Sequence, residues 1–144
     1  MKLKDNALLR TWGYINGEWV NSASGATLAV TNPATGETLG TVPDMGAGET
    51  KRAISAAALA FPAWAAKTAE ERAVILRRWF NLMMENREDL AVVMTAEQGK
   101  PLAESNGEIG YAASFIEWFA EEGRRLYGEI IPPHQADKRL MVLR

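Results

Sequence analysis

The sequence of 144 residues contains no cysteine and only one histidine, His134. Without cysteine the chain has no thiolate nucleophile, no disulfide and no cysteine-based zinc site, and a single histidine leaves no second imidazole for a metal. His134 follows the turn-forming pair Pro132-Pro133, so we expect a solvated loop histidine there. On these residues alone the chain is not a complete enzyme.

Glycine-rich phosphate-binding strings and long apolar runs are also missing. Neither GxGxxG, nor GxxxxGK followed by Ser or Thr, nor GxSxG occurs, which excludes these phosphate cradles and a nucleophile elbow. No run reaches the roughly 18 apolar residues of a membrane span, and the N-terminus lacks a signal peptide. The 16 basic and 18 acidic residues are scattered, so we expect a soluble, cytoplasmic chain with no membrane and no nucleic-acid partner.

The first third of the sequence has the pattern of antiparallel strands. Asn16-Gly17 lies between short apolar pairs within Trp12 to Val20, and this dipeptide favours a two-residue hairpin turn. Thr27 to Thr31 and Glu37 to Pro43 alternate like strands around the turn formers at 32–36. Small hairpins are marginal alone, so we expect them to lie against helices.

Three long helices are predicted after residue 48. The first runs from about Glu49 to Lys67, with a kink or an end at Pro62. Thr68 and Glu71 have the spacing of a capping box that opens the second helix.

The second predicted helix is amphipathic. It ends near Asn86, restarts through Glu88 to Glu97 and stops at Gly99, the residue type that best accepts a left-handed C-terminal position. We expect Arg77, Arg78 and Asn81 on its polar side. The residues expected on its buried side are Ala73, Leu76, Trp79, Phe80 and Met83.

The third predicted helix runs from Pro101 to about Tyr127 and ends at Gly128. Its apolar arc is too wide for one neighbour, and we expect its aromatic flank to be core. Glu117, Glu121 and Arg125 fit surface pairing along the helix. The arc is centred on Ile109, Ala112, Ala113, Ile116 and Ala120, with Tyr111, Phe115 and Phe119 on the flank.

Lys138 to Arg144 has a strand pattern that is apolar at the centre of both faces. No partner strand follows it, so we expect this segment to be mobile or to pair with another copy of itself.

Five strings in this order carry a family resemblance. They are INGEWV at 15–20, TNPATGE at 31–37, ERAVILRRWFNLMMENREDLA at 71–91, EQGKPLAE at 97–104 and YAASFIEWFAEEGRRLYGEIIP at 111–132. Together they resemble the N-terminal region of the aldehyde dehydrogenase superfamily over essentially the whole chain. Within it, the run from 108 to 128 and the following HQADKRL are most similar to bacterial succinate-semialdehyde dehydrogenases.

The resemblance implies an α/β fold, which appears as α+β in this portion: antiparallel hairpin strands, three long helices and a terminal strand, without the Rossmann core. It divides the chain into the N-terminal part of a cofactor-binding domain, residues 1–131, and the start of an oligomerisation arm, residues 132–144. The enzymes of this group are implied to be homo-oligomers.

The activity that the resemblance implies is oxidation of succinate semialdehyde to succinate, with hydride passed to NADP or NAD. The catalytic cysteine and glutamate, the oxyanion asparagine and the dinucleotide site of the family match no position up to Arg144. We therefore expect the chain alone to be inactive and to bind no cofactor.

Two lesser assignments follow from the resemblance. Glu97 and the backbone of Val30 and Thr31 match a monovalent-cation position, although a merely solvated Glu97 is the simpler interpretation. Gly107 and Tyr111 match the lining of the aldehyde tunnel. For Tyr111 the alternative, and simpler, interpretation is packing in the core. Two other functions stay open: a freestanding helical module that binds a partner through the third helix, and a truncated reading frame without a function of its own.

Overall fold

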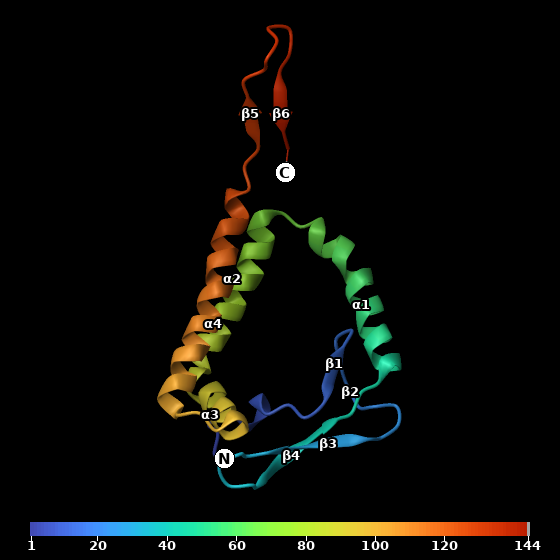
Figure 1. The fold of residues 1–144 in the computed structure, drawn as a ribbon, viewed down its shortest axis with the longest axis vertical. Helices are drawn as coiled ribbons and strands as arrows, with labels where there is room; N and C mark the ends of the chain where they lie inside the picture. Colours follow the sequence, from blue (N-terminus) through green and yellow to red (C-terminus); the bar gives the residue numbers. More distant parts are fainter. Residues whose placement is uncertain (144) are drawn as a thin grey trace.

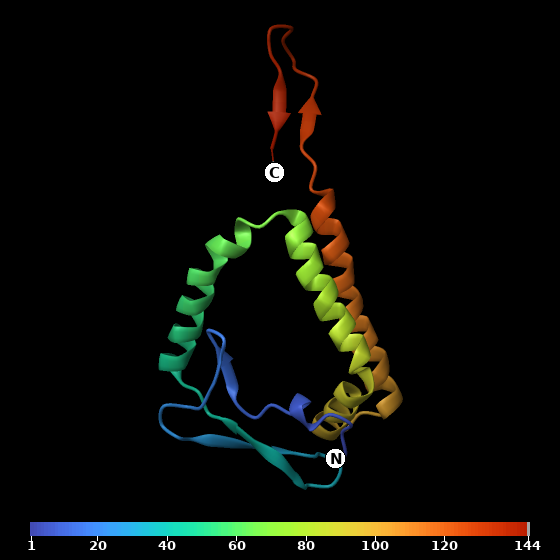
Figure 2. The ribbon, with the colours of Figure 1, turned by 180° about the vertical axis from the view of Figure 1, so that it is seen from behind.

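The computed structural model describes residues 1–143, which form an open, three-sided frame with a projecting arm (Figures 1 and 2). One side is helix α1, a second is the pair α2 and α4 with α3 at its lower end, and the base consists of strands. The elements in chain order are η1 (Asn6–Leu8), β1 (Gly13–Ile15), β2 (Glu18–Val20), β3 (Thr27–Thr31), β4 (Thr38–Pro43), α1 (Ala47–Ala65), α2 (Ala69–Glu85), α3 (Arg87–Gln98), α4 (Leu102–Glu122), η2 (Gly123–Arg125), β5 (Glu129–Ile131) and β6 (Leu140–Val142).

The two predicted N-terminal hairpins are confirmed. Asn16 and Gly17 have φ values of 53° and 85°, the positive pair that a tight hairpin turn between β1 and β2 requires. Tyr14 pairs with Trp19 across this hairpin, and their ring centroids are 5.1 Å apart. Strands β3 and β4 pair antiparallel, with a register shift between Val30 and Thr31.

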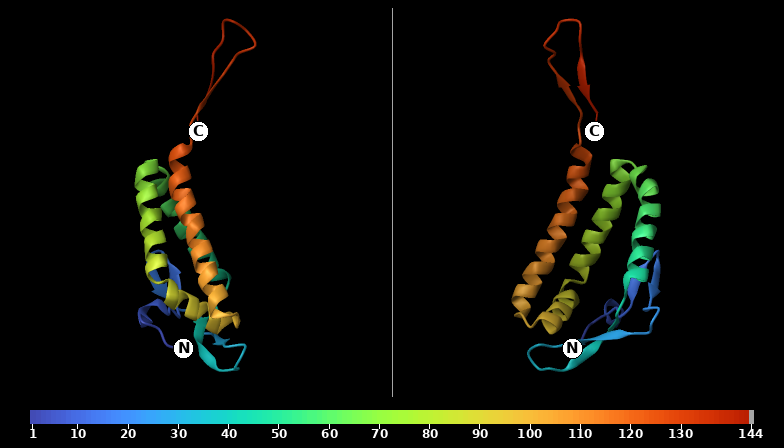
Figure 3. Two further views of the ribbon diagram at one scale, coloured as in Figure 1. Left: turned by 90° about the vertical axis from the view of Figure 1, so that its left-hand side faces the viewer. Right: turned by 45° about the vertical axis from the view of Figure 1, so that its right-hand side comes forward.

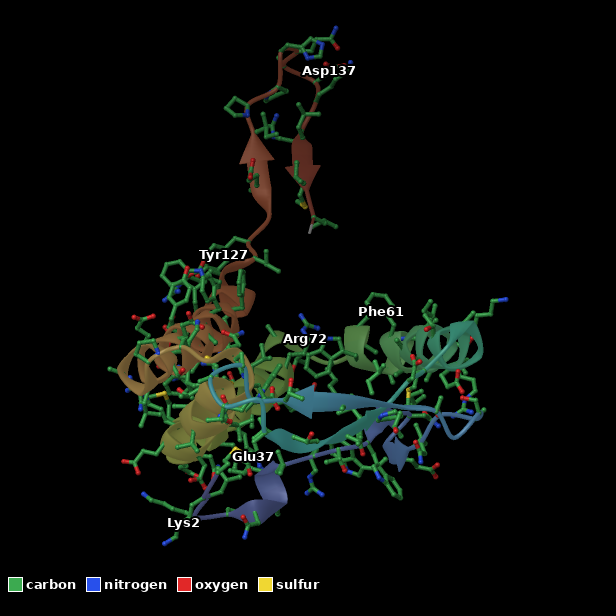
Figure 4. The ribbon with its side chains drawn as sticks, turned by 60° about the horizontal axis from the view of Figure 1, so that its bottom comes forward. Lys2, Glu37, Phe61, Arg72, Tyr127 and Asp137 are labelled. Atoms are coloured by element: carbon green, nitrogen blue, oxygen red, sulfur yellow. The ribbon has the colours of Figure 1, made fainter. Side chains whose placement is uncertain are left out.

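Helix α1 continues to Ala65, so Pro62 lies inside it and does not end it. Proline removes one backbone donor, and at this position the loss falls in the last turn. Helix α1 contacts the rest of the described chain mainly at β1. Figure 4 shows Phe61 near the end of α1 that leads towards Arg72 in α2, and the arm that carries Asp137 beyond Tyr127.

The capping box that opens α2 is confirmed. The Glu71 amide donates to Thr68 Oγ1 at 3.2 Å, and the Thr68 amide donates to Glu71 Oε2 at 2.7 Å. Helix α2 then runs alongside α4 for its whole length (Figure 3). Two face assignments are wrong: Trp79 is 55% exposed, and Arg77 turns towards α4 instead of solvent. Both lie at the border of the apolar stripe, where a small rotation of the helix decides which side chain is covered.

The end of α3 is confirmed, since Gly99 has a φ of 77°. The limits predicted for the next helix are wrong at both ends. Pro101 precedes α4 as its cap residue, and α4 ends at Glu122, where the chain tightens into η2. Gly123, a poor helix former, is the residue at this change. Gly128 instead allows close approach in the arm, because a Cβ there would overlap the Val142 carbonyl oxygen.

The buried interior is small and is made largely of alanine. Its apolar members are Leu3, Ala73, Ala91, Ala96, Ile109, Ala113 and Ala120. The described chain exposes 10569 Å², whereas a compact monomer of this mass exposes about 7,300 Å². The frame thus leaves about 3,000 Å² more surface open than a packed globule does.

The aromatic flank of α4 is exposed, which corrects the expectation that it is core. Tyr111, Phe115 and Phe119 are 67%, 47% and 61% exposed, and Ala112 is exposed as well. Helices α2 and α3 cover one side of α4 only. The expected width of the apolar arc is therefore seen, but its second side has no neighbour within residues 1–143.

The expectation of an unpartnered final strand is also wrong. Strand β6 pairs antiparallel with β5, and Ile130 lies opposite Met141. The partner precedes β6 and is only three residues long, so its pattern was too short to recognise. Arg144, the last residue of the predicted strand, lies outside the described residues. His134 is exposed in the loop of this hairpin, as expected.

Candidate functional site around the α3–α4 junction

The C-terminal end of α3 lies against the turn that follows β3. A Cβ added to Gly99 would stand 2.8 Å from Pro33 Cγ, closer than real Cβ contacts allow, and the backbone there is already left-handed. The Gly99 amide donates to the Thr95 carbonyl oxygen at 2.8 Å and closes the helix. Only glycine meets both demands, so this residue joins the β3–β4 hairpin to the helical layer.

The three residues of the predicted cation position lie on the two segments that this junction brings together. Val30 is half-buried and Thr31 is exposed, and the register of β3 and β4 shifts between them. Glu97 is exposed in the last turn of α3. Among the described residues no group of three or more histidine or acidic side chains has the arrangement of a metal site. The expectation of a site built from one carboxylate and backbone carbonyls stays a prediction.

Polar contacts tie α3 to the first half of α4. The hydroxyls of Thr95 and Ser105 lie 2.8 Å apart, and Ser105 is fully buried. Lys100 forms an ion pair with Glu108. Arg87 Nε donates to the Asn106 carbonyl oxygen at 2.9 Å. The start of α4 is therefore positioned by side chains from the preceding helix and loop.

Gly107 and Tyr111 lie one turn apart on an uncovered side of α4. Apart from the backbone of its own helix and its two chain neighbours, Gly107 has no atom within 4 Å of the place that a Cβ would take. Tyr111 is 67% exposed and makes an edge-to-face contact with Phe115, with ring centroids 4.8 Å apart. Core packing for Tyr111 is wrong within this chain. Its predicted place in a substrate tunnel stays a prediction.

The second half of α4 carries an open surface depression of about 620 Å³, lined by Ser114, Phe115, Glu117, Trp118, Phe119 and Glu121. Arg77 of α2 contacts two of these carboxylates, with Nη1–Oε1 of Glu117 at 2.5 Å and Nη2–Oε1 of Glu121 at 2.6 Å. The hydrogen bond to Glu117 is the largest cause that raises the Arg77 pKa. Arg125 pairs with Glu122. The predicted pairing along α4 is therefore wrong, because both glutamates bind across to α2.

Two buried carboxylates that the sequence pattern did not single out fix loops onto helices. Asp89 accepts hydrogen bonds from the amides of Lys4 at 3.0 Å and Asp5 at 2.8 Å. Glu49 accepts from the amides of Ala23 at 2.8 Å and Gly46 at 3.0 Å. The bonds from Lys4 and from Ala23 are the largest causes that lower the pKa of Asp89 and of Glu49, respectively. The bonds from Lys4 and Asp5 to Asp89 and from Ala23 to Glu49 come from segments distant in sequence, which no local pattern indicates.

The glycine-containing transition from β4 into α1 does not fit a dinucleotide. Within residues 1–143 all strand pairs are antiparallel. The transition from β4 into α1 has glycines at Gly46 and Gly48, but the Glu49 carboxylate occupies the helix N-terminus. A pyrophosphate bound at this helix start would be repelled by that charge.

This order of strands and helices, joined at Gly99, is the arrangement of the N-terminal part of a known protein family. Residues 19–144 match the model of the aldehyde dehydrogenase family, and the chain belongs to this family. The resemblance stated from the sequence strings is thereby confirmed.

Within the family, the chain is similar to semialdehyde dehydrogenases. The chain is 65% identical over 144 residues to a glutarate-semialdehyde dehydrogenase of Pseudomonas putida and 65% identical to the NADP(+) succinate-semialdehyde dehydrogenase of Escherichia coli. In both cases the match covers 100% of this chain and 30% of the relative. The chain thus spans about a third of the length of the curated relatives it matches.

Solved structures agree with this portion of the fold. An NADP-dependent enzyme of E. coli matches with a TM-score of 0.93 and 65% identity, over 97% of this chain and 29% of that chain. A succinate-semialdehyde dehydrogenase from Burkholderia pseudomallei matches with a TM-score of 0.93 and 60% identity, over 98% and 29%. The predicted fold class is confirmed. Separately, none of the helices within residues 1–143 combines the length and apolarity needed to cross a bilayer.

Proposed function

We propose that the chain forms the N-terminal part of an NAD(P)-dependent dehydrogenase that oxidises succinate semialdehyde to succinate. The observation that carries the proposal is the 65% identity, along all 144 residues, to the NADP(+) succinate-semialdehyde dehydrogenase of E. coli. The equal identity to a glutarate-semialdehyde dehydrogenase supports the same substrate class, a semialdehyde with a distal carboxylate. A homo-oligomer in the cytoplasm is part of this proposal.

In this proposal the chain contributes framework and entrance, and the chemistry comes from elsewhere in the enzyme. With no cysteine in the sequence, the thiolate that attacks the aldehyde is supplied by another segment. The same is proposed for the site of NADP or NAD, because the negative charge of Glu49, which accepts from the Gly46 amide, lies at the start of α1.

The chimera that joins residues 1–144 to the remainder of the E. coli relative tests the proposal. We expect NADP reduction that depends on succinate semialdehyde, with kcat/KM within about tenfold of the parent enzyme. Residues 1–144 alone are the control and should give no turnover. A soluble, helical chimera without activity would refute the proposal.

Three finer assignments belong to the same proposal. Gly107 and Tyr111 line the aldehyde entrance, supported by their uncovered side of α4. Glu97, with the carbonyls of Val30 and Thr31, holds a monovalent cation, supported by the contact of Gly99 with Pro33 and by the irregular register of β3. Replacing Glu97 with Gln in the chimera should change the dependence of its stability on potassium or sodium.

The division of the chain at residues 131 and 132 is the third assignment. Hairpin β5–β6 projects away from the frame in Figure 1, which supports an arm with a role in assembly. Because β5 (Glu129–Ile131) pairs with β6, the division falls inside this hairpin, and the projecting arm begins near residue 128. Removal of the arm from the chimera should lower its oligomeric state, as measured by sedimentation.

A freestanding helical binding module is the second candidate, favoured by the exposed aromatic side of α4 with Tyr111, Phe115 and Phe119. The nucleotide sequence that follows the codon for Arg144 separates the candidates. A continuation that encodes a catalytic cysteine supports the dehydrogenase, whereas its absence supports the module or a truncated reading frame.

A further inference from the structure

The turn of α4 that carries the proposed aldehyde entrance is weak as a helix. It contains Gly107 and Gly110 within four residues, and glycine is among the poorest helix formers because its backbone loses the most freedom. The Tyr111 side of this turn is uncovered. The position of Gly107 and Tyr111 therefore depends on contacts made from the opposite side.

Two of those contacts come from Arg87, the first residue of α3, beside the Thr95–Ser105 hydrogen bond and the buried side chain of Ile109. The Nε of Arg87 donates to the Asn106 carbonyl oxygen at 2.9 Å. Its guanidinium lies flat against Gly110, where an added Cβ would stand 3.4 Å from Nη2 and 3.5 Å from Cζ. Asn106 and Gly110 are one turn apart, and each directly precedes a proposed entrance residue. One planar group thus supports both ends of the glycine-containing turn.

The backbone on both sides of Arg87 is held in place by hydrogen bonds. Asn86, which precedes it, donates from Nδ2 to the Leu82 carbonyl oxygen at 2.8 Å. Asp89, two residues further on, is bound by the amides of Lys4 and Asp5. Arg87 is half-buried. It therefore extends from a fixed backbone position in α3 to Asn106 and Gly110 in α4. We call this bridging side chain the Arg87 strut.

We propose that Arg87 is a positioning residue for the aldehyde entrance: by holding Asn106 and Gly110 it sets the rotation of α4, and so the direction of the Tyr111 ring. The inference rests on the proposed function for its link to substrate. Lysine cannot replace Arg87, because an ammonium group has neither the planar face for Gly110 nor the fixed fork of donors.

Hydrogen exchange on residues 1–144 tests the strut without reference to activity. Arg87→Ala should speed amide exchange at 106–111 roughly tenfold and leave 117–122 unchanged. Arg77→Ala is the matched control and should do the reverse, since Arg77 binds Glu117 and Glu121. Unchanged exchange at 106–111 in Arg87→Ala would overturn the inference.

Kinetics of the chimera test the consequence. Arg87→Ala and Arg87→Lys should each raise KM for succinate semialdehyde roughly fivefold, while kcat and the KM for NADP stay within about twofold. Arg78→Ala, at an exposed arginine of α2, should match the unsubstituted chimera. A loss of active protein with unchanged KM would make Arg87 merely structural and overturn the link to substrate. An inactive unsubstituted chimera would instead refute the proposed function, and hydrogen exchange would still decide whether Arg87 supports α4.

Discussion

Replacing Gly99 with alanine should destabilise the chain more than any other single methyl group added to a glycine of the helical layer. The φ of 77° costs an L-residue about 1–2 kcal/mol. The new Cβ would also lie 2.8 Å from Pro33 Cγ, so the turn after β3 must move or the helix end must open. We therefore expect the free energy of unfolding to fall by at least about 1–2 kcal/mol.

Urea unfolding followed by far-ultraviolet circular dichroism measures this change. Gly107→Ala is the matched control: the position is inside α4 with open space around it, so the same methyl group should stabilise by about 0.5–1 kcal/mol. Combining Gly99→Ala with Pro33→Ala separates the two causes. Removal of the proline ring should recover the part of the stability loss that comes from the steric clash, and the part that comes from backbone strain should remain. Equal stability of Gly99→Ala and the parent chain would refute the argument, as would a double variant that recovers nothing.

The remaining predictions concern caps, pH and the arm. Thr68→Ala removes the side-chain acceptor that opens α2 and should lower stability by about 1 kcal/mol in the same urea assay, whereas Thr50→Ala, at an exposed site in α1, should not. The pKa of Asp89 is lower in the folded chain than in the unfolded chain, so its contribution to stability is present at neutral pH and is lost as pH falls through the unfolded and then the folded pKa. Asp89→Asn should therefore flatten the dependence of the urea midpoint on pH below about pH 4, and an unchanged slope would contradict this. Deletion of residues 128–144 should leave the helical dichroism signal intact, because β5 and β6 pair with each other; loss of helix would show that the arm supports the frame.

Features with a local cause were predictable from the sequence. The hairpin turn at Asn16-Gly17, the cap at Thr68 and the helix end at Gly99 each depend on residues within one turn of one another. In each case one residue type is strongly favoured by backbone geometry or by an unpaired amide. The pattern therefore identified both the element and its boundary.

Features that depend on distant segments were not predictable. Helical periodicity places Arg77 on the solvent side, because it describes one helix and does not include Glu117 on another helix, 40 residues away. Asp89 binds amides 84 and 85 residues distant. Tyr111 was expected in the core because an apolar arc does not tell which part of it the chain covers.

The candidate site could be predicted only in part, because some of its contacts also join segments that are distant in sequence. The helix end at Gly99 is predictable from the preference of glycine for a left-handed backbone. Its close approach to Pro33 is not, because that approach depends on how the β3–β4 hairpin packs against α3. No sequence motif marks Arg87, and the role proposed for it depends on Gly110 having no side chain, which lets the guanidinium lie close to the helix. Glu97 and Tyr111, two of the residues assigned from the family resemblance, are exposed in this chain, so the roles proposed for them depend on segments other than residues 1–143.

The openness of the frame has a calorimetric consequence. An unfolded chain of this mass exposes about 23,000 Å², so folding to 10569 Å² removes about a fifth less surface from water than folding to a compact globule does. The heat capacity of unfolding and the slope in urea both scale with that area. The chain should therefore melt over a wider temperature range than a packed domain of equal length, and covering the open side of α4 with further polypeptide should sharpen the transition.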